Sequence, residues 1–194
     1  MKTPPSLYLF VAIIIASCNH EAKKSAPVKS YMQPTISNVA DTNQILLSKV
    51  YLYAFSDASK LDTFKLVMKG KSINTGNIKF EIISFNNQKI YSEDFKAYDL
   101  LGDLDNLSAK QNEDTIRTRF INFFRPENFS APALDRKLDL LDTDYVDLKT
   151  QKDISSDQTA IGFTYSVGYE GYSEIAYSKK QKMTVVCSAS DWLY

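Results

Sequence analysis

Histidine is almost missing from this chain, which has one, His20, among 194 residues. Histidine is the side chain that ordinarily titrates near neutral pH, and it supplies the base of Ser-His-Asp and Cys-His pairs and many zinc ligands. Because His20 lies close to the N-terminus, outside the segment expected to fold, the sequence excludes these nucleophile pairs and the usual histidine-containing zinc sites. The residues favour a protein without catalytic activity, and no cofactor or metal is expected.

Glycine, cysteine and net charge are low as well. The six glycines form neither GxxxxGK[ST] nor GxGxxG, which excludes nucleotide binding by those routes. With 23 basic and 23 acidic residues and a pI near 6.6, the chain lacks the basic excess of a nucleic-acid-binding domain, so DNA and RNA are not expected partners. Cys187 has neither a CxxC neighbour nor a histidine partner, and we expect a small buried side chain there.

No hydrophobic run reaches the length of a membrane-spanning helix, which needs about 20 apolar residues. The apolar segment 7–16 follows the basic Lys2 and precedes small residues, as in a secretory signal peptide. Its end, Ile15-Ala16-Ser17-Cys18, resembles the lipobox of bacterial lipoprotein precursors, with Ile where Leu is commoner. This resemblance covers only the first residues and implies that 1–17 is a cleaved signal peptide. An ordinary signal peptide or an uncleaved anchor is the alternative.

The resemblance also implies where in the cell the protein is located. The Cys of a lipobox becomes the acylated N-terminus, so Cys18 is the expected lipidation site, and several acyl chains anchor stably where one does not. By the sorting habits of such lipoproteins, Asn19 after the Cys favours the outer membrane. The mixed charges of residues 19–24 favour its periplasmic face over the cell surface. The membrane is thus an expected partner through the lipid.

Beyond Cys18 the chain divides into a tether and one domain. Residues 18–43 contain Pro27, Pro34 and several Ser and Lys without an apolar period, which is typical of a flexible linker. Residues 44–194 have the length and composition of a single domain. In general appearance the domain resembles small bacterial lipoproteins with a β-rich domain, which supply no functional residues to carry over.

Strands are expected on both sides of one helix. Ile78, Phe80 and Ile82 alternate with charged residues, and Asn86-Asn87 suits a turn, so 78–95 predicts a β-hairpin. Further strand patterns cover 49–55, 64–68, 159–167, 174–177 and 182–189. This order favours an α+β fold, a mainly antiparallel sheet with one long helix packed on it. The alternative is a β-sandwich with an inserted helix.

The helix is expected over about 109–125. Ser108 and Gln111 fit a capping box, and Pro126 is expected to close the helix. Four residues recur at helical spacing and predict one buried stripe: Ile116, Phe120, Phe123 and Phe124. The segment 128–148 fits a loop with a short helix or strand.

Acidic residues cluster twice, at Asp99, Asp103 and Asp105, and again at Asp139, Asp142, Asp144 and Asp147. Neither cluster has the glycine and terminal glutamate of an EF-hand loop, so ordinary solvated loops are favoured over calcium sites. Paired carboxylates for glycoside cleavage remain formally open, because that mechanism needs only two acids at a suitable distance.

The most suggestive local feature is a group of tyrosines with glycines among them. Such residues in a β-rich segment can form an aromatic surface that stacks on sugars or docks a protein, or can simply cover a half-exposed sheet. The candidate binding patch is Tyr165, Tyr169, Tyr172 and Tyr177. The sequence thus favours a non-catalytic, membrane-anchored binding module for an envelope protein or component. The alternative is a carbohydrate-binding or carbohydrate-processing accessory protein.

Overall fold

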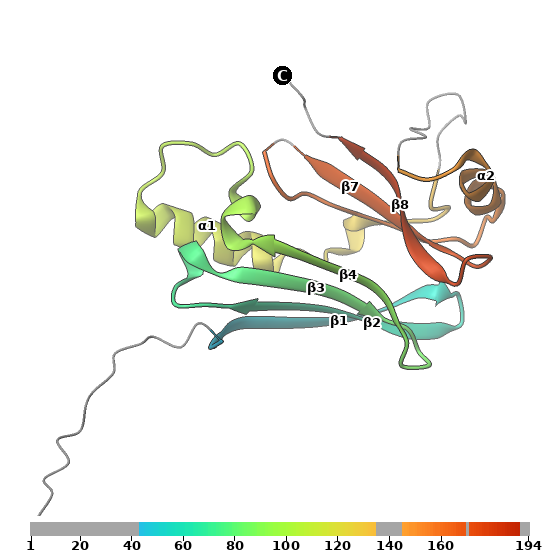
Figure 1. Ribbon diagram of the computed structural model, residues 1–194, viewed down its shortest axis with the longest axis horizontal. Helices are drawn as coiled ribbons and strands as arrows, with labels where there is room; N and C mark the ends of the chain where they lie inside the picture. Colours follow the sequence, from blue (N-terminus) through green and yellow to red (C-terminus); the bar gives the residue numbers. More distant parts are fainter. Residues whose placement is uncertain (1–42, 135–144, 170, 191–194) are drawn as a thin grey trace, which may run out of the picture. The chain divides into compact units, whose positions relative to one another are not determined.

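The structure is a computed structural model that describes residues 43–134, 145–169 and 171–190. The predicted signal peptide, Cys18 and nearly all of the tether lie outside these residues. The described strands form two antiparallel sheets with the orders β1-β2-β3-β4 and β5-β6-β7-β8 (Figure 1). The strands are β1 Ile45–Asp57, β2 Lys60–Lys69, β3 Asn77–Ile83, β4 Lys89–Lys96, β5 Phe129–Ser130, β6 Gly162–Tyr165, β7 Tyr172–Ser178 and β8 Met183–Ser190. The helices are α1 Ala109–Ile121 and α2 Leu148–Ser156, with short 3₁₀ turns η1 Ile73–Thr75, η2 Ala97–Leu101 and η3 Pro126–Asn128.

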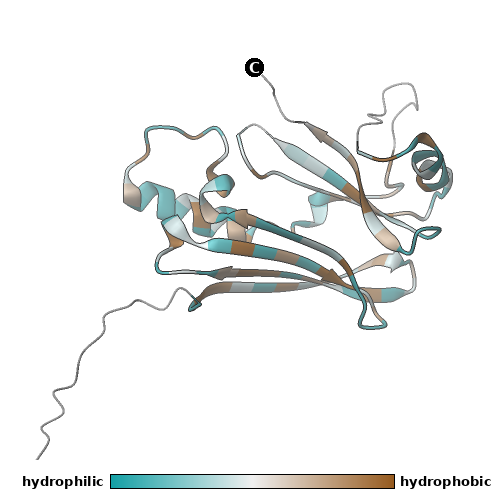
Figure 2. Cartoon of the chain, in the orientation of Figure 1, coloured by the Kyte–Doolittle hydropathy of each residue, from teal (hydrophilic) through white to brown (hydrophobic). Residues whose placement is uncertain are grey.

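The first sheet has one buried face. Hydrophobic and hydrophilic residues alternate along its strands (Figure 2), and successive side chains of a strand point to opposite faces. Phe64 pairs with Ile82 and Leu66 with Phe80 in the β2–β3 register, and all four side chains are fully buried. The predicted hairpin is confirmed, since β3 pairs with β4 and Asn87 takes the left-handed conformation (φ 63°) in the turn.

The second sheet packs on this buried face. Phe163 of β6 lies 5.5 Å from Phe64 between ring centroids, and Phe129 of β5 stacks on Tyr53 of β1 at 4.0 Å. Residues of both sheets belong to one hydrophobic core, which also includes the aromatic residues that follow α1. Burial of these rings, worth about 1.5–3 kcal/mol for each large side chain, holds the sheets together.

Helix α1 begins as predicted but ends earlier. The Ser108 hydroxyl accepts from the Gln111 amide, and the Gln111 side chain accepts from the Ser108 amide, which confirms the capping box. The last helical residue is Ile121, four residues before the predicted end. Phe123 and Phe124 are nevertheless buried, because the chain turns into the core after the helix.

Helix α2 was not singled out by the sequence pattern. Asp147 caps it, because its carboxylate accepts from the amides of Lys149 and Thr150. Its buried Ile154 belongs to a second, smaller cluster, in which Ala176 and Cys187 also lie. The second sheet therefore has buried residues on both faces.

The expected class is confirmed in its coarse form, a mixed α+β domain with antiparallel strands. The finer expectation of a single sheet with one long helix was wrong. The described residues form two sheets and two α-helices, because the C-terminal strands pair with one another and cover the first sheet instead of extending it. The alternative, a sandwich with an inserted helix, is closer to this arrangement.

Candidate functional site

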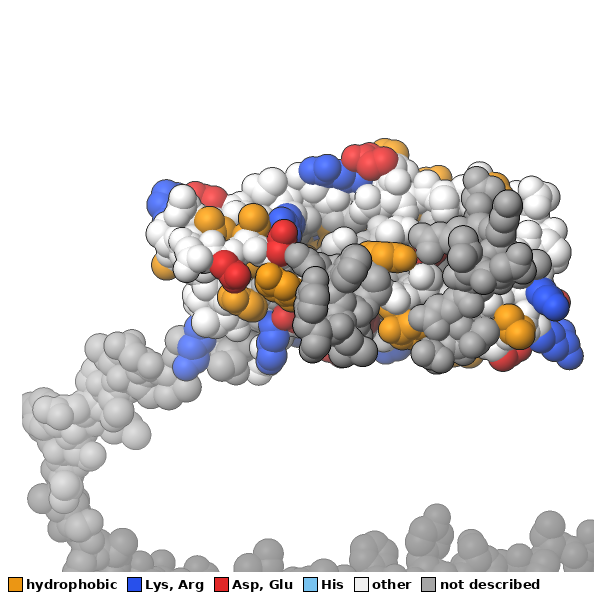
Figure 3. Space-filling view, turned by 90° about the horizontal axis from the view of Figure 1, so that it is seen from above, with side chains coloured by type: hydrophobic (Ala, Val, Ile, Leu, Met, Phe, Trp, Pro, Cys, Tyr) orange, Lys and Arg blue, Asp and Glu red, His pale blue; other side chains and the backbone are white. Residues whose placement is uncertain are grey.

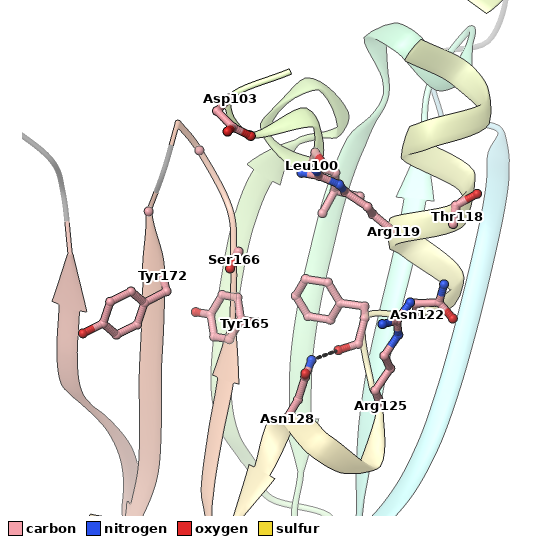
Figure 4. Close-up of a pocket in the computed structure, with 14 residues that line it drawn as sticks. Leu100, Asp103, Thr118, Arg119, Asn122, Arg125, Asn128, Tyr165, Ser166 and Tyr172 are labelled. Atoms are coloured by element: carbon pink, nitrogen blue, oxygen red, sulfur yellow. Dashed lines mark hydrogen bonds between the residues drawn. The ribbon is translucent and has the colours of Figure 1, made fainter. Parts of the chain in front are cut away.

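A cavity of about 560 Å³ lies where the end of α1 meets the loop between β6 and β7 (Figure 4). We call it the Arg119 cavity. Its polar lining comes from separate parts of the chain. Asp103 follows η2, Arg119 lies in α1 with Asn122 and Arg125 just after it, and Tyr165 ends β6 with Ser166 next to it.

Arg119 is held against the wall of this cavity. Its Nη1 donates to the carbonyl of Leu100 at 3.0 Å. Gly102 stands beside it in a left-handed conformation (φ 61°), and a Cβ at Gly102 would lie 2.9 Å from that nitrogen. The amide of Gly168 donates to the carbonyl of Asp99 at 2.9 Å and joins the two loops across the cavity. A glycine at position 102 thus makes room for the guanidinium.

Arg125 is the more accessible of the two arginines. Its Nη1 lies 3.7 Å from Glu127 Oε1, and the side chains of this long ion pair are 49% and 65% exposed. The Lys49 ammonium approaches the same helix end and donates to the carbonyl of Ile121. Burial, and then the positive charge of Arg125, lower the pKa of Lys49. Cations are favoured at this end, where the helix dipole is negative.

The charge of the lining is positive, since Asp103 is its one carboxylate against Arg119 and Arg125. Two amides add neutral hydrogen-bonding groups, those of Asn122 and Asn128, and Asn128 Nδ2 donates to the carbonyl of Phe123 at 3.0 Å. Guanidinium groups bind carboxylates and phosphates with paired hydrogen bonds. This arrangement suits an anionic group with neighbouring polar atoms.

Tyr165 forms part of the cavity wall without offering a free hydroxyl. It is 3% exposed, and its hydroxyl donates to the Glu93 carboxylate. Tyr91 Oη lies 2.7 Å from Tyr165 Oη and 3.2 Å from Glu93 Oε2. Burial raises the pKa of both tyrosines above their ordinary value of 10.0. Both hydroxyls therefore remain protonated at neutral pH and serve as hydrogen-bonding groups of the core.

The four tyrosines of the predicted patch are not gathered into one surface. Tyr165 is buried, whereas Tyr169 is 59% exposed in the loop after β6. Tyr172 lines the cavity, but in Figure 4 its ring points away from Arg119. Tyr177 lies in a different hollow. Alternation along the strands separates them, since Tyr165 pairs with Ser173 and so shares a face with that residue and not with Tyr172.

The second hollow, of about 640 Å³, is formed by turns at the ends of three hairpins. Tyr177, Phe85, Asn86 and Lys179 contribute to its lining. Burial, and then the charge of Asp62, raise the pKa of Tyr177. Lys179 is engaged by Asp157, 2.5 Å away, whose pKa falls to about 2 mainly through that hydrogen bond.

Two residues of the acidic clusters cap helical turns. Asp99 accepts from the Lys96 amide at 2.7 Å and caps η2, and Asp147 caps α2. Asp139, Asp142 and Asp144 lie outside the described residues. Within the described ranges no group of three or more His, Cys, Asp or Glu side chains is placed to hold a metal.

Cys187 is fully buried beneath α2, as expected. Burial, and then the negative charge of Glu174, raise the pKa of its thiol to about 12. The thiol is therefore protonated at neutral pH, and it is a poor nucleophile in the folded protein because the thiolate is the reactive form.

Sequence reasoning missed the arginines of the cavity. In the sequence, Arg119 and Arg125 look like ordinary surface residues of a helix. Asp103 and Tyr165, which line the same cavity, are distant from them in the chain. The one local signal was Gly102, a glycine that no predicted turn required.

Comparison with known proteins gives no relative on which a function could be based. No family model, curated protein or solved structure matches the chain. In the described part of the chain, no helix combines the length and hydrophobicity needed to cross a membrane.

Proposed function

We propose that this chain is a non-catalytic binding protein of the bacterial envelope that recognises an acidic component through the Arg119 cavity. Cys18 carries the lipid that attaches it to the outer membrane, and the domain lies on the periplasmic face. The lipobox-like tetrad supports the anchor, and the fold supports the binding role.

The observation that carries the binding role is the positive lining of the cavity. Two guanidinium groups and two side-chain amides line it against one carboxylate. Tyr165 is not poised as a nucleophile in this lining, because burial holds it protonated and its hydroxyl is engaged by Glu93. The ligand class that fits is a carboxylate-bearing saccharide or peptide of the envelope.

Binding of an acidic oligosaccharide tests this role. The probe is a carboxylated hexasaccharide, hexaglucuronate, compared with the neutral cellohexaose by calorimetric titration. Arg125→Gln is expected to weaken hexaglucuronate binding at least tenfold, since a hydrogen bond to a charged group contributes about 1.5–3 kcal/mol. The matched control is Arg117→Gln, which removes a guanidinium of α1 that is paired with Glu113 at 2.7 Å. Equal binding of hexaglucuronate by both variants would show that the Arg119 cavity is not the binding site.

A carbohydrate-binding accessory protein is the second candidate, favoured by the hollow at the hairpin ends. Phe85 is 43% exposed there, and the amides of Asn86 and Gln88 lie near it. Exposed rings beside amides suit stacking on a neutral sugar. Binding of cellohexaose that is lost in Phe85→Ala and retained in Arg125→Gln would favour this candidate.

The attachment to the membrane and the orientation of the domain are tested separately in cells. Membrane retention should be lost in Cys18→Ala, which cannot be acylated. The domain should resist added protease until the outer membrane is permeabilised. Digestion in intact cells would contradict the periplasmic orientation while leaving the anchor in place.

A further inference from the structure

We propose that the outer face of the first sheet docks on anionic lipid headgroups. By outer face we mean the side of β1–β4 that points away from the core. The inference rests on the proposed lipid anchor, which holds the domain close to a bilayer, and it adds the orientation that the domain takes there.

The strand registers place a defined set of side chains on this face. Val50 pairs with Lys65, and Lys65 pairs with Glu81. The next row runs from Leu52 to Thr63 and Ile83. Along each strand these residues alternate with the buried ones, so their side chains point to the outer face. Charged and apolar side chains are therefore neighbours on that face.

Several apolar side chains of this face are more than half exposed to solvent. Val50 is 56% exposed, Leu52 55% and Leu61 58%. The second sheet packs on the opposite, buried face of the first sheet (Figure 1). A cluster of exposed apolar side chains beside charged ones marks an interaction surface.

Charge is segregated although the whole chain is neutral. Residues 45–96 contain eight lysines and five acidic residues, whereas residues 97–194 contain 11 basic and 16 acidic residues. Two of the five acids, Asp62 and Glu93, turn into the core. The other three are engaged by lysines in the ion pairs Lys60–Asp57, Lys89–Glu81 and Lys79–Asp94.

Among the described residues of this part of the domain, four more lysines form no ion pair with a carboxylate: Lys65, Lys69, Lys71 and Lys96. Lys49 is not counted here, because it contacts the end of α1. Without it, the outer face and its borders still have more lysines than acidic residues. The face of the molecule seen in Figure 3 differs, because its described basic, acidic and hydrophobic side chains are interspersed in small groups.

A lipid surface fits this combination better than a soluble acidic partner. Each Lys near an anionic surface is attracted electrostatically, and the apolar side chains can enter the headgroup region while the lysine stems extend along it. The tether joins the domain at β1, the strand that carries Val50 and Leu52. An acylated Cys18 would therefore hold the domain close to the bilayer.

The experiment uses the full-length acylated protein reconstituted in vesicles of phosphatidylcholine alone or mixed with phosphatidylglycerol. An amine-reactive label is read by mass spectrometry at Lys65 and Lys69, with Lys110 of α1 and Lys152 of α2 as reference positions. We expect labelling of Lys65 and Lys69 to be several-fold slower on the mixed vesicles, and high salt to restore it. Labelling of the reference lysines should be the same on both.

A variant tests the apolar contribution without touching the core. Val50→Ser with Leu52→Ser should reduce the protection of Lys65, whereas the matched control Ile121→Ser, at a residue 60% exposed on α1, should not. Loss of vesicle retention in the unmodified protein would refute the anchor. Retention with equal labelling on both kinds of vesicle would refute the docking of the outer face and leave the lipid anchor in place. Protection by a soluble acidic polysaccharide and not by vesicles would also overturn the lipid assignment.

Discussion

The hydroxyls of Tyr91 and Tyr165 lie 2.7 Å apart and connect the two sheets inside the core. Tyr91 belongs to β4 and Tyr165 to β6, and Glu93 of β4 accepts a hydrogen bond from the Tyr165 hydroxyl. Buried polar groups must be satisfied to be tolerated, and this set satisfies itself. It therefore fixes how the sheets face each other beside the Arg119 cavity.

The first prediction concerns the stability that this network provides. Tyr165→Phe removes a buried hydroxyl and leaves Tyr91 and Glu93 with one partner fewer, so we expect the free energy of unfolding to fall by about 1–3 kcal/mol. Urea denaturation measures it. The exposed Tyr169→Phe is the control and should change stability by less than about 0.5 kcal/mol. Equal effects of the two substitutions would show that the network contributes nothing.

The second prediction is a loss of stability at alkaline pH. Burial raises the pKa of Tyr91 and Tyr165 in the folded state, whereas a tyrosine of the unfolded chain titrates near about pH 10. Above that pH the unfolded state releases protons that the folded state retains, so the free energy of unfolding falls as pH rises.

Each group contributes up to about 1.4 kcal/mol per pH unit to this slope. Urea denaturation on both sides of about pH 10 measures it. Tyr165→Phe should make the dependence shallower than in the unmodified protein. An unchanged slope would mean that the buried hydroxyls ionise as easily as exposed ones.

Much of the local structure could be predicted because it is determined by residues that are close together in the sequence. The alternation of Ile78, Phe80 and Ile82 reports one buried face, and Ser108 with Gln111 reports a helix start. Both signals depend on residues a few positions apart, and both are confirmed. The end of α1 was misplaced because Phe123 and Phe124 are buried without being helical, and burial alone produced the periodic pattern.

The arrangement of the sheets and of the site depends on distant pairs and was not accessible from local pattern. A strand that is buried on both faces, such as β7, gives no sign of which sheet it joins. The tyrosines of the predicted patch are dispersed for the same reason, since Tyr165 and Tyr172 lie on opposite faces of the second sheet. Arg119 and Arg125 come to line one cavity only because the fold brings the loops around Gly102 and Gly168 to the end of α1.

The third prediction tests the helix start that the sequence indicated. Ser108→Ala leaves the amide of Gln111 without its side-chain acceptor, so stability should fall by about 1 kcal/mol. Urea denaturation measures the change. Ser48→Ala, on an exposed position of β1, is the control and should have little effect. A loss no larger than that of the control would show that the capping box is not formed in solution.

The fourth prediction concerns Cys187. A thiol with a pKa near 12 and no exposure should react with a disulfide reagent only when the protein opens. In the Cys18→Ala background, the native protein at neutral pH should be modified far more slowly than the urea-unfolded protein. Ser59→Cys, in the exposed turn between β1 and β2, supplies an accessible thiol for comparison. Fast modification of native Cys187 would contradict its burial.

The fifth prediction separates the shape of the Arg119 cavity from the stability of the domain. Gly102 and Gly168 both have positive φ, at 61° and 79°, so alanine at either should cost about 1–2 kcal/mol of stability. Only at Gly102 would the added Cβ meet Arg119, because nothing lies within 4 Å of a Cβ at Gly168. Gly102→Ala should therefore weaken hexaglucuronate binding in a calorimetric titration, and Gly168→Ala should not. Equal weakening by both would mean that Arg119 needs no fixed position to serve the ligand.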